Sequence, residues 1–166
     1  MLKTVRELGL LAVGVGLLGL LTSWLLAADN VLGNWLLAAF LAGHGWIHAM
    51  YLMPEQMTQP KAATATASSW PFKLEHSWLS TSVGAPEPLL RSLGRALVVL
   101  TVVTFALAAL ATIPLILPAS LWQGLVLVGA VGSLALMTVF VHRSLVIGLA
   151  IDVVLIVAVL GGTWTP

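Results

Sequence analysis

The chain has 166 residues, of which 60% are hydrophobic and only 8% are charged, and its mean hydropathy is +1.06. A soluble domain carries about 25% charged residues, so this composition excludes a water-facing shell and indicates an integral membrane protein. The formal net charge of +1, with no cluster of basic and aromatic residues, gives no sign of nucleic-acid binding. The absence of Cys excludes disulfides, thiolate metal sites and cysteine nucleophiles.

The first predicted membrane span is residues 8–28, which carry no charge and are long enough to cross a hydrocarbon core of about 30 Å. A cleaved signal peptide is the competing interpretation, because Ala27 and Ala28 suit a cleavage site, and it would leave four spans. The apolar region of a signal peptide is normally only about 7–15 residues long. We therefore expect a retained first span.

The second predicted span, residues 31–53, contains His44 and His48 and ends at a proline. Residues 54–95 form the long polar segment of the chain, which we expect to be a loop. Within this loop, residues 70–79 mix tryptophans with charged residues. That mixture is typical of a segment lying in the headgroup zone of a bilayer.

Three further spans are predicted after the loop, at residues 96–113, 120–141 and 145–164. The first two belong to one uncharged stretch that is too long for a single span. Pro114 and Pro118 lie inside this stretch, and prolines interrupt helices, so we expect a turn between them.

The distribution of positive charge supports this count of spans. With five alternating spans, all seven Lys and Arg residues fall on the N-terminal side of the membrane. Cytoplasmic loops carry the excess of Lys and Arg. We therefore expect the chain to lie in the cell (inner) membrane, with its N-terminus in the cytoplasm and its C-terminus on the outer side. The expected fold is therefore one all-α, polytopic helical membrane domain over residues 1–166, with a cytoplasmic loop at 54–95.

Three ionisable residues lie within the predicted spans: His44, His48 and Asp152. Such residues are costly at membrane depth and mark functional sites. The two histidines are at i and i+4, so they share one helix face, which Tyr51 continues. At 1.5 Å per residue, His44 and Asp152 each lie roughly 13 Å from the cytoplasmic ends of their spans, and His48 lies about 6 Å shallower. Matched depth makes an Asp152–His44 pair possible.

The preferred interpretation is a small membrane subunit or binding protein whose site at His44, His48 and Asp152 holds a metal ion or a haem-like cofactor. In the metal form, His44 and His48 are ligands and Asp152 is a third ligand or orients one of them. Imidazoles at this spacing suit a divalent ion, and a carboxylate commonly orients a ligating histidine. Zinc hydrolases with helical ligands often have the pattern HExxH, in which the Glu is the general base. Here Gly45 follows His44, so that base is missing and an enzyme is not favoured.

A second form of this interpretation has a haem-like tetrapyrrole with His44 as axial ligand. Gly43 and Gly45 flank that histidine and would leave room for a macrocycle. A second axial ligand would have to come from another helix, where His142 is the candidate. Trp46 is expected to lie deep beside the histidines, where it could stack on a bound ligand or pack in the core.

Two alternatives remain open. In one, Asp152 and the histidines relay protons or bind a transported cation in a transporter or channel component. In the other, they only fix helix packing in a structural or assembly subunit. The expected partners are the lipid bilayer and either further copies of the chain or other subunits of a membrane complex.

The run His44-Gly-Trp-Ile-His48, followed by Thr58-Gln-Pro60, resembles a group of small multi-pass bacterial and archaeal membrane proteins that carry an HGLIH-type motif. The later run Trp70-Pro-Phe-Lys-Leu-Glu-His-Ser-Trp-Leu79 is similar to their aromatic loop. The resemblance covers about residues 40–80 and implies no activity. This chain departs from the group because a whole predicted span precedes the motif.

Overall fold

The computed structural model describes residues 31–53, 72–74, 77–113, 117–142 and 145–162. Every regular element in these ranges is a helix, which confirms the all-α class. In chain order the elements are α2 (Val31–Ala49), η1 (Met50–Leu52), α3 (Trp78–Val83), α4 (Glu87–Thr112), η3 (Ala119–Leu121), α5 (Trp122–Val139) and α6 (Val146–Leu160). The predicted span at 8–28 and residues 54–71 and 75–76 of the predicted loop lie outside the described residues.

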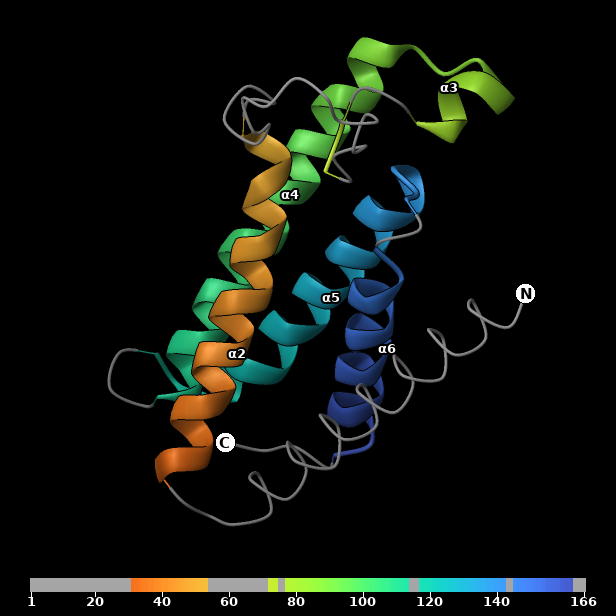
Figure 1. Cartoon of the computed structure of the whole chain (residues 1–166). Coiled ribbons are helices and arrows are strands. Elements are labelled where there is room, and N and C mark those ends of the chain that lie inside the picture. Colours follow the sequence, from red (N-terminus) through yellow and green to blue (C-terminus); the bar gives the residue numbers. More distant parts are fainter. Residues whose placement is uncertain (1–30, 54–71, 75–76, 114–116, 143–144, 163–166) are drawn as a thin grey trace, which may run out of the picture.

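The long helices α2, α4, α5 and α6 form a bundle (Figure 1). Helix α4, drawn in green, packs against both α2 and α5, and α5 packs in turn against α6. The α2–η1 pair covers the predicted second span, and α5 and α6 lie within the predicted fourth and fifth spans. Helices far apart in the sequence therefore meet along the length of the bundle.

Helix α4 begins earlier than the predicted span at 96–113. It starts at Glu87, with Pro86 as its N-cap and a proline in its first turn, where the missing N–H costs nothing. Glu87 also favours the positive end of the helix, and Arg91 lies 4.0 Å from it on the next turn. Residues 87–95, expected in the loop, are therefore helical, whereas the predicted break near Pro114 is confirmed by the end of α4.

Glycines allow the helices to approach one another closely at two places. A Cβ at Gly45 of α2 would lie 2.8 Å from the Cβ of Phe105 on α4. A Cβ at Gly132 of α5 would lie 3.0 Å from Thr101 Oγ1 on α4. Small residues let helix backbones come together in this way, and the approach at Gly45 brings Phe105 against the histidine-bearing part of α2.

Two hydrophobic clusters fill the bundle. The first contains Leu37, Leu41, Phe105, Trp122, Val126 and Leu155, with smaller residues around them. The second contains Tyr51, Leu74, Leu90, Val98, Leu136, Met137, Phe140 and Leu145. Along α2, His44 and His48 lie between Leu41 of the first cluster and Tyr51 of the second. The histidines are thus placed between two apolar layers.

Two helical stretches, Glu87–Thr112 and Ala119–Val139, are long and apolar enough to cross a membrane, and Val146–Leu160 is a shorter apolar helix. Fewer than half of the residues in the two longer stretches are buried within the protein. Large hydrophobic side chains are exposed along the outward faces of all the long helices. Examples are Leu32, Trp46, Val99, Val103, Val131, Val153, Val157 and Leu160.

The described part of the predicted interfacial segment at 70–79 packs onto one end of the bundle. Phe72 meets the Tyr51 ring edge-to-face at 5.2 Å. Ser77 Oγ donates a hydrogen bond to the Val139 carbonyl, and Trp78 Nε1 donates one to the Thr138 carbonyl, each at 2.7 Å. The last carbonyls of a helix have no partner within it, so this segment caps α5 from outside.

Candidate functional site

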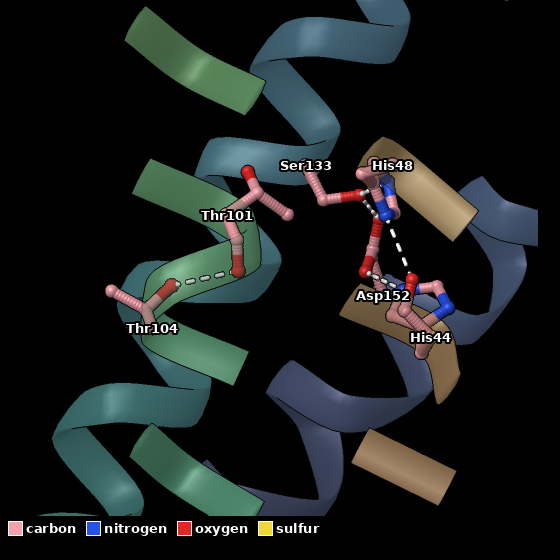
Figure 2. A network of polar contacts seen from close by, with 6 residues as sticks. All are labelled: His44, His48, Thr101, Thr104, Ser133 and Asp152. Atoms are coloured by element: carbon pink, nitrogen blue, oxygen red, sulfur yellow. Dashed lines mark hydrogen bonds and ion pairs between the residues drawn. The ribbon is translucent and has the colours of Figure 1, made fainter. Parts of the chain in front are cut away.

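Four polar side chains meet between the two hydrophobic clusters (Figure 2). His44 and His48 come from α2, Ser133 from α5 and Asp152 from α6. Their exposed fractions are 5%, 3%, 0% and 0%, so water does not satisfy them and they must satisfy one another. His44 Nε2 lies 2.8 Å from Asp152 Oδ1, which is the pairing that matched depth made possible.

The four side chains form a continuous hydrogen-bonded chain, referred to here as the His–Ser–Asp chain. Ser133 Oγ lies 2.5 Å from Asp152 Oδ2 and 2.7 Å from His48 Nε2. His48 Nδ1 lies 2.9 Å from the backbone carbonyl oxygen of His44, one turn earlier. A carbonyl only accepts, so His48 Nδ1 carries a proton and donates it.

The His–Ser–Asp chain is one proton short when Asp152 is ionised and both imidazoles are neutral. Its four hydrogen bonds require four protons, but two neutral imidazoles and one hydroxyl carry only three, and a carboxylate carries none. If Ser133 donates its proton to Asp152, Ser133 Oγ and His48 Nε2 face each other as two hydrogen-bond acceptors. One added proton, on Asp152 or on His48, or one metal ion therefore completes the chain and balances the negative charge of Asp152.

Aromatic rings fix the orientation of His44. The Phe105 ring meets the imidazole edge-to-face, with the ring centroids 5.0 Å apart and the planes at 80°. The Phe40 ring stacks with its centroid at 6.1 Å and its plane at 9°. Phe105 reaches this position because Gly45 leaves room for it. Since this space is filled, it offers no room for a macrocycle beside His44.

The donor atoms of His44, His48 and Asp152 are close enough to share a metal ion. One ligand atom from each lies within 4.8 Å of the other two. In a tetrahedral zinc site with bonds near 2.1 Å, donor atoms are about 3.4 Å apart. His48 also donates its Nδ1 proton to a carbonyl, as metal-bound histidines usually do, and this directs its Nε2 lone pair into the cluster.

Three other residues predicted for the site lie outside the His–Ser–Asp chain. Trp46 is 63% exposed, on the outer side of α2, and so does not lie in the core. Tyr51 is buried in the second hydrophobic cluster. His142 is partly buried just beyond the end of α5. Gly43 faces open space, with nothing within 4 Å of a Cβ there.

Ser133 is the site residue that sequence reasoning missed. It is fully buried and bridges His48 to Asp152. The signal that could have found it is a hydroxyl near the middle of an otherwise apolar helix, since Thr138, the other hydroxyl of α5, lies at the helix end. Serines of this kind often bond only to their own helix, so the signal has little specificity.

Comparison of the chain with protein-family models, with curated proteins and with solved structures found no match. No relative therefore assigns a role to any residue of the site. The chemistry of the His–Ser–Asp chain has to be judged from its own distances, burial and charge.

Proposed function

We propose that this chain is a five-span protein of the cell membrane and that His44, His48 and Asp152 hold a divalent metal ion within the bilayer. The observation that carries the metal proposal is the convergence of three buried ligand atoms, one from each residue, within 4.8 Å of one another. The predicted span at 8–28 supplies the first crossing, and α2, α4, α5 and α6 supply the others. The resemblance to HGLIH-type membrane proteins remains a proposal and adds no activity.

The outward faces of the bundle support a lipid environment. The exposed side chains on α4 from Ala96 onward are Ala, Val and Leu, and those on α6 are Val, Ile and Leu. An apolar surface of this extent is unfavourable in water. Helix α6 has 15 residues, fewer than the roughly 20 that cross a bilayer. The uncharged residues on either side of it in the predicted span at 145–164 would complete the crossing.

A resident metal ion is favoured over a proton in transit, because the described residues directly above and below the His–Ser–Asp chain are mainly apolar. Leu37 and Leu41 lie on one side, and Leu136 and Met137 lie on the other. Proton and ion pathways through membranes are lined by polar or ionisable residues. Two imidazoles and a carboxylate are, in addition, a common ligand set for first-row transition metals.

A metal ion is also favoured over a tetrapyrrole. The rings of Phe40 and Phe105 already lie beside His44, and His142 is not part of the His–Ser–Asp chain. A single ion needs only small movements of side chains that already converge. The space around His44 thus favours the metal form of the cofactor hypothesis over the tetrapyrrole form.

The decisive experiment compares wild-type protein with Asp152→Asn, each purified in detergent and titrated with Zn²⁺ or Co²⁺. The Asn amide can accept from His44 Nε2 and donate to Ser133, which then donates to His48. All four hydrogen bonds are made without an added cation, so the fold should be retained. Changes next to the ligands cost about 10–100-fold in metal affinity, and we expect the loss of this ligand to cost more.

His142→Gln is the matched control, because it removes a histidine outside the His–Ser–Asp chain and should bind metal like the wild type. Elemental analysis should find about one equivalent of metal in the wild type and in this control. Wild-type protein that binds no metal, or an Asp152→Asn variant that binds it equally well, would refute the metal proposal. The missing charge would then be a proton, and the relay or packing interpretations would replace it.

The number of spans can be tested separately, because the chain has no native Cys. Thr4→Cys and Thr165→Cys place a single thiol near each end of the chain. With five spans, a membrane-impermeant maleimide applied to intact cells should label Thr165→Cys only. Labelling of both variants, or of neither, would indicate an even number of spans.

A further inference from the structure

We propose that Ser133 is the fourth donor of this metal site and that the resulting set of two imidazoles, one carboxylate and one hydroxyl selects a first-row divalent ion such as Fe²⁺, Co²⁺ or Zn²⁺. This inference rests on the proposed metal-binding function and adds a ligand and an ion class to it. Ser133 is fully buried, and its helix contributes no other group to the His–Ser–Asp chain.

The position of the Ser133 oxygen is that of a ligand. A hydroxyl has one proton and two lone pairs. Its proton points to Asp152 Oδ2, at 2.5 Å, which leaves a lone pair facing His48 Nε2 at 2.7 Å. A cation placed where these two lone pairs converge contacts both atoms and replaces their repulsion with two bonds.

The movement required for ligation is small. Tetrahedral donors around a zinc-sized ion are about 3.4 Å apart, so Ser133 Oγ and His48 Nε2 must separate by less than about 1 Å. Rotation about the side-chain bonds of Ser133 and Asp152 can supply this without moving a helix. His44 Nε2 can bind the metal ion when its proton shifts to Nδ1, because this frees the Nε2 lone pair and leaves the ring neutral.

The backbone beside Ser133 is held firmly in place. Gly132 and Gly129 of α5 lie against α4, where an added Cβ would be 3.0 Å from Thr101 Oγ1 and from Thr104 Oγ1, respectively. α5 therefore cannot draw back from the site without losing this packing. A ligand whose backbone is fixed loses little further freedom when an ion binds, which favours binding.

The donor set restricts the class of ion. It contains no thiolate or thioether, which are the ligands that Cu⁺ prefers. Ca²⁺ takes six to eight oxygen ligands, and Mg²⁺ requires octahedral oxygen coordination with several waters. Imidazole with carboxylate and hydroxyl suits divalent iron, cobalt or zinc, so these ions should bind in preference to Cu⁺, Ca²⁺ and Mg²⁺.

The test is the Ser133→Cys variant of the full chain in detergent, loaded with Co²⁺. If residue 133 is a ligand, the thiol loses its proton to solvent on binding, and a thiolate-to-cobalt charge-transfer band appears in the near ultraviolet. Because the chain has no native Cys, the band can come from no other residue. Thr104→Cys is the matched control: it places a buried thiol on α4, outside the His–Ser–Asp chain (Figure 2), and should give no such band.

The outcomes separate this inference from the proposed function. Co²⁺ binding by the wild type together with a Ser133→Cys variant that lacks the band would overturn the role of Ser133 and leave the metal site standing. No Co²⁺ binding by the wild type would overturn both proposals. If Ser133→Cys does not fold, Ser133→Ala replaces it, and we expect about 10–100-fold weaker Co²⁺ binding with altered visible bands. Unchanged affinity and bands in Ser133→Ala would also refute the inference.

Discussion

The last turn of α2 and the following helix η1 carry buried polar side chains that differ in their hydrogen bonding. His48 has both ring nitrogens in hydrogen bonds, to the His44 carbonyl and to Ser133. Tyr51 follows on the same buried face, but its hydroxyl has no hydrogen-bond partner among the described residues. The difference lies in what the neighbouring helices present: polar groups opposite His48, and Leu136 and Phe140 in the cluster around Tyr51.

This contrast shows that a polar stripe on one helix becomes a site only where other helices supply complementary groups. A buried donor or acceptor without a partner costs about 1–3 kcal/mol. The His–Ser–Asp chain avoids that cost once a cation completes it, whereas the Tyr51 hydroxyl does not. Substitutions in the two regions should therefore have opposite effects on stability.

The largest effect is expected for Asp152→Leu, which removes both acceptors from the His–Ser–Asp chain. His44 Nε2–H is left buried without an acceptor, at about 1–3 kcal/mol, and the metal site loses a ligand, whereas the Ser133 hydroxyl can turn to His48 Nε2. Unfolding in mixed detergent micelles should show the loss. Asp152→Asn, which keeps every hydrogen bond, is the control; if it were as unstable as Asp152→Leu, the proposed pattern of hydrogen bonds would be wrong.

Gly45→Ala should have the next largest effect, because it inserts a methyl group between α2 and α4. The new Cβ would lie 2.8 Å from the Phe105 Cβ, and such overpacking costs about 1–3 kcal/mol. The displaced Phe105 ring would also release His44, so metal affinity should fall with stability. Gly43→Ala, which meets nothing within 4 Å, is the control and should lose neither. Equal losses in the two variants would contradict the close approach at Gly45.

Trp78→Phe should have a smaller effect that is confined to the cap of α5. It removes the Nε1 hydrogen bond to the Thr138 carbonyl, and a typical hydrogen bond contributes about 1 kcal/mol. Amide hydrogen exchange should rise near the end of α5 and not around Ser133. Trp46→Phe, on the exposed side of α2, should leave both regions unchanged.

Tyr51→Phe is expected to have the smallest effect, and of the opposite sign. It removes a buried hydroxyl that has no partner among the described residues and keeps the ring that meets Phe72. Stability in detergent should be equal to or slightly above that of the wild type. A clear loss of stability or of bound metal would show that the hydroxyl belongs to the site after all.

The helices were largely predictable because their limits depend on local chemistry. The prolines at 54, 114 and 118 predicted where helices end. The structure agrees, because η1 ends at Leu52 and α4 ends at Thr112. The early start of α4 was missed because Glu87 and Arg91 were counted as loop charges. With a proline in the first turn and an ion pair on the next, they instead suit the polar beginning of a helix.

The site was predictable only in part. The distances of His44 and Asp152 from the cytoplasmic ends of their predicted spans indicated that the two residues lie at the same depth. Helical spacing indicated that His48 and Tyr51 share the face of His44. The expectation that Trp46 stacks on a ligand or packs in the core was wrong because it overlooked this spacing, which puts Trp46 about 200° around α2 from His44 and on the exposed side. The contributions of Ser133 and Phe105 depend on how α5 and α4 pack against α2, and no local pattern encodes that packing.

The contact between Phe72 and Tyr51 has a consequence for the length of the loop. Because the rings meet at 5.2 Å, the chain positions on either side of residues 54–71 lie close together. The entropic cost of closing a loop grows only with the logarithm of its length, by about 0.6 kcal/mol for each doubling. Residues 54–71 should thus accept an inserted tag or a short deletion while the bundle and its buried site remain intact.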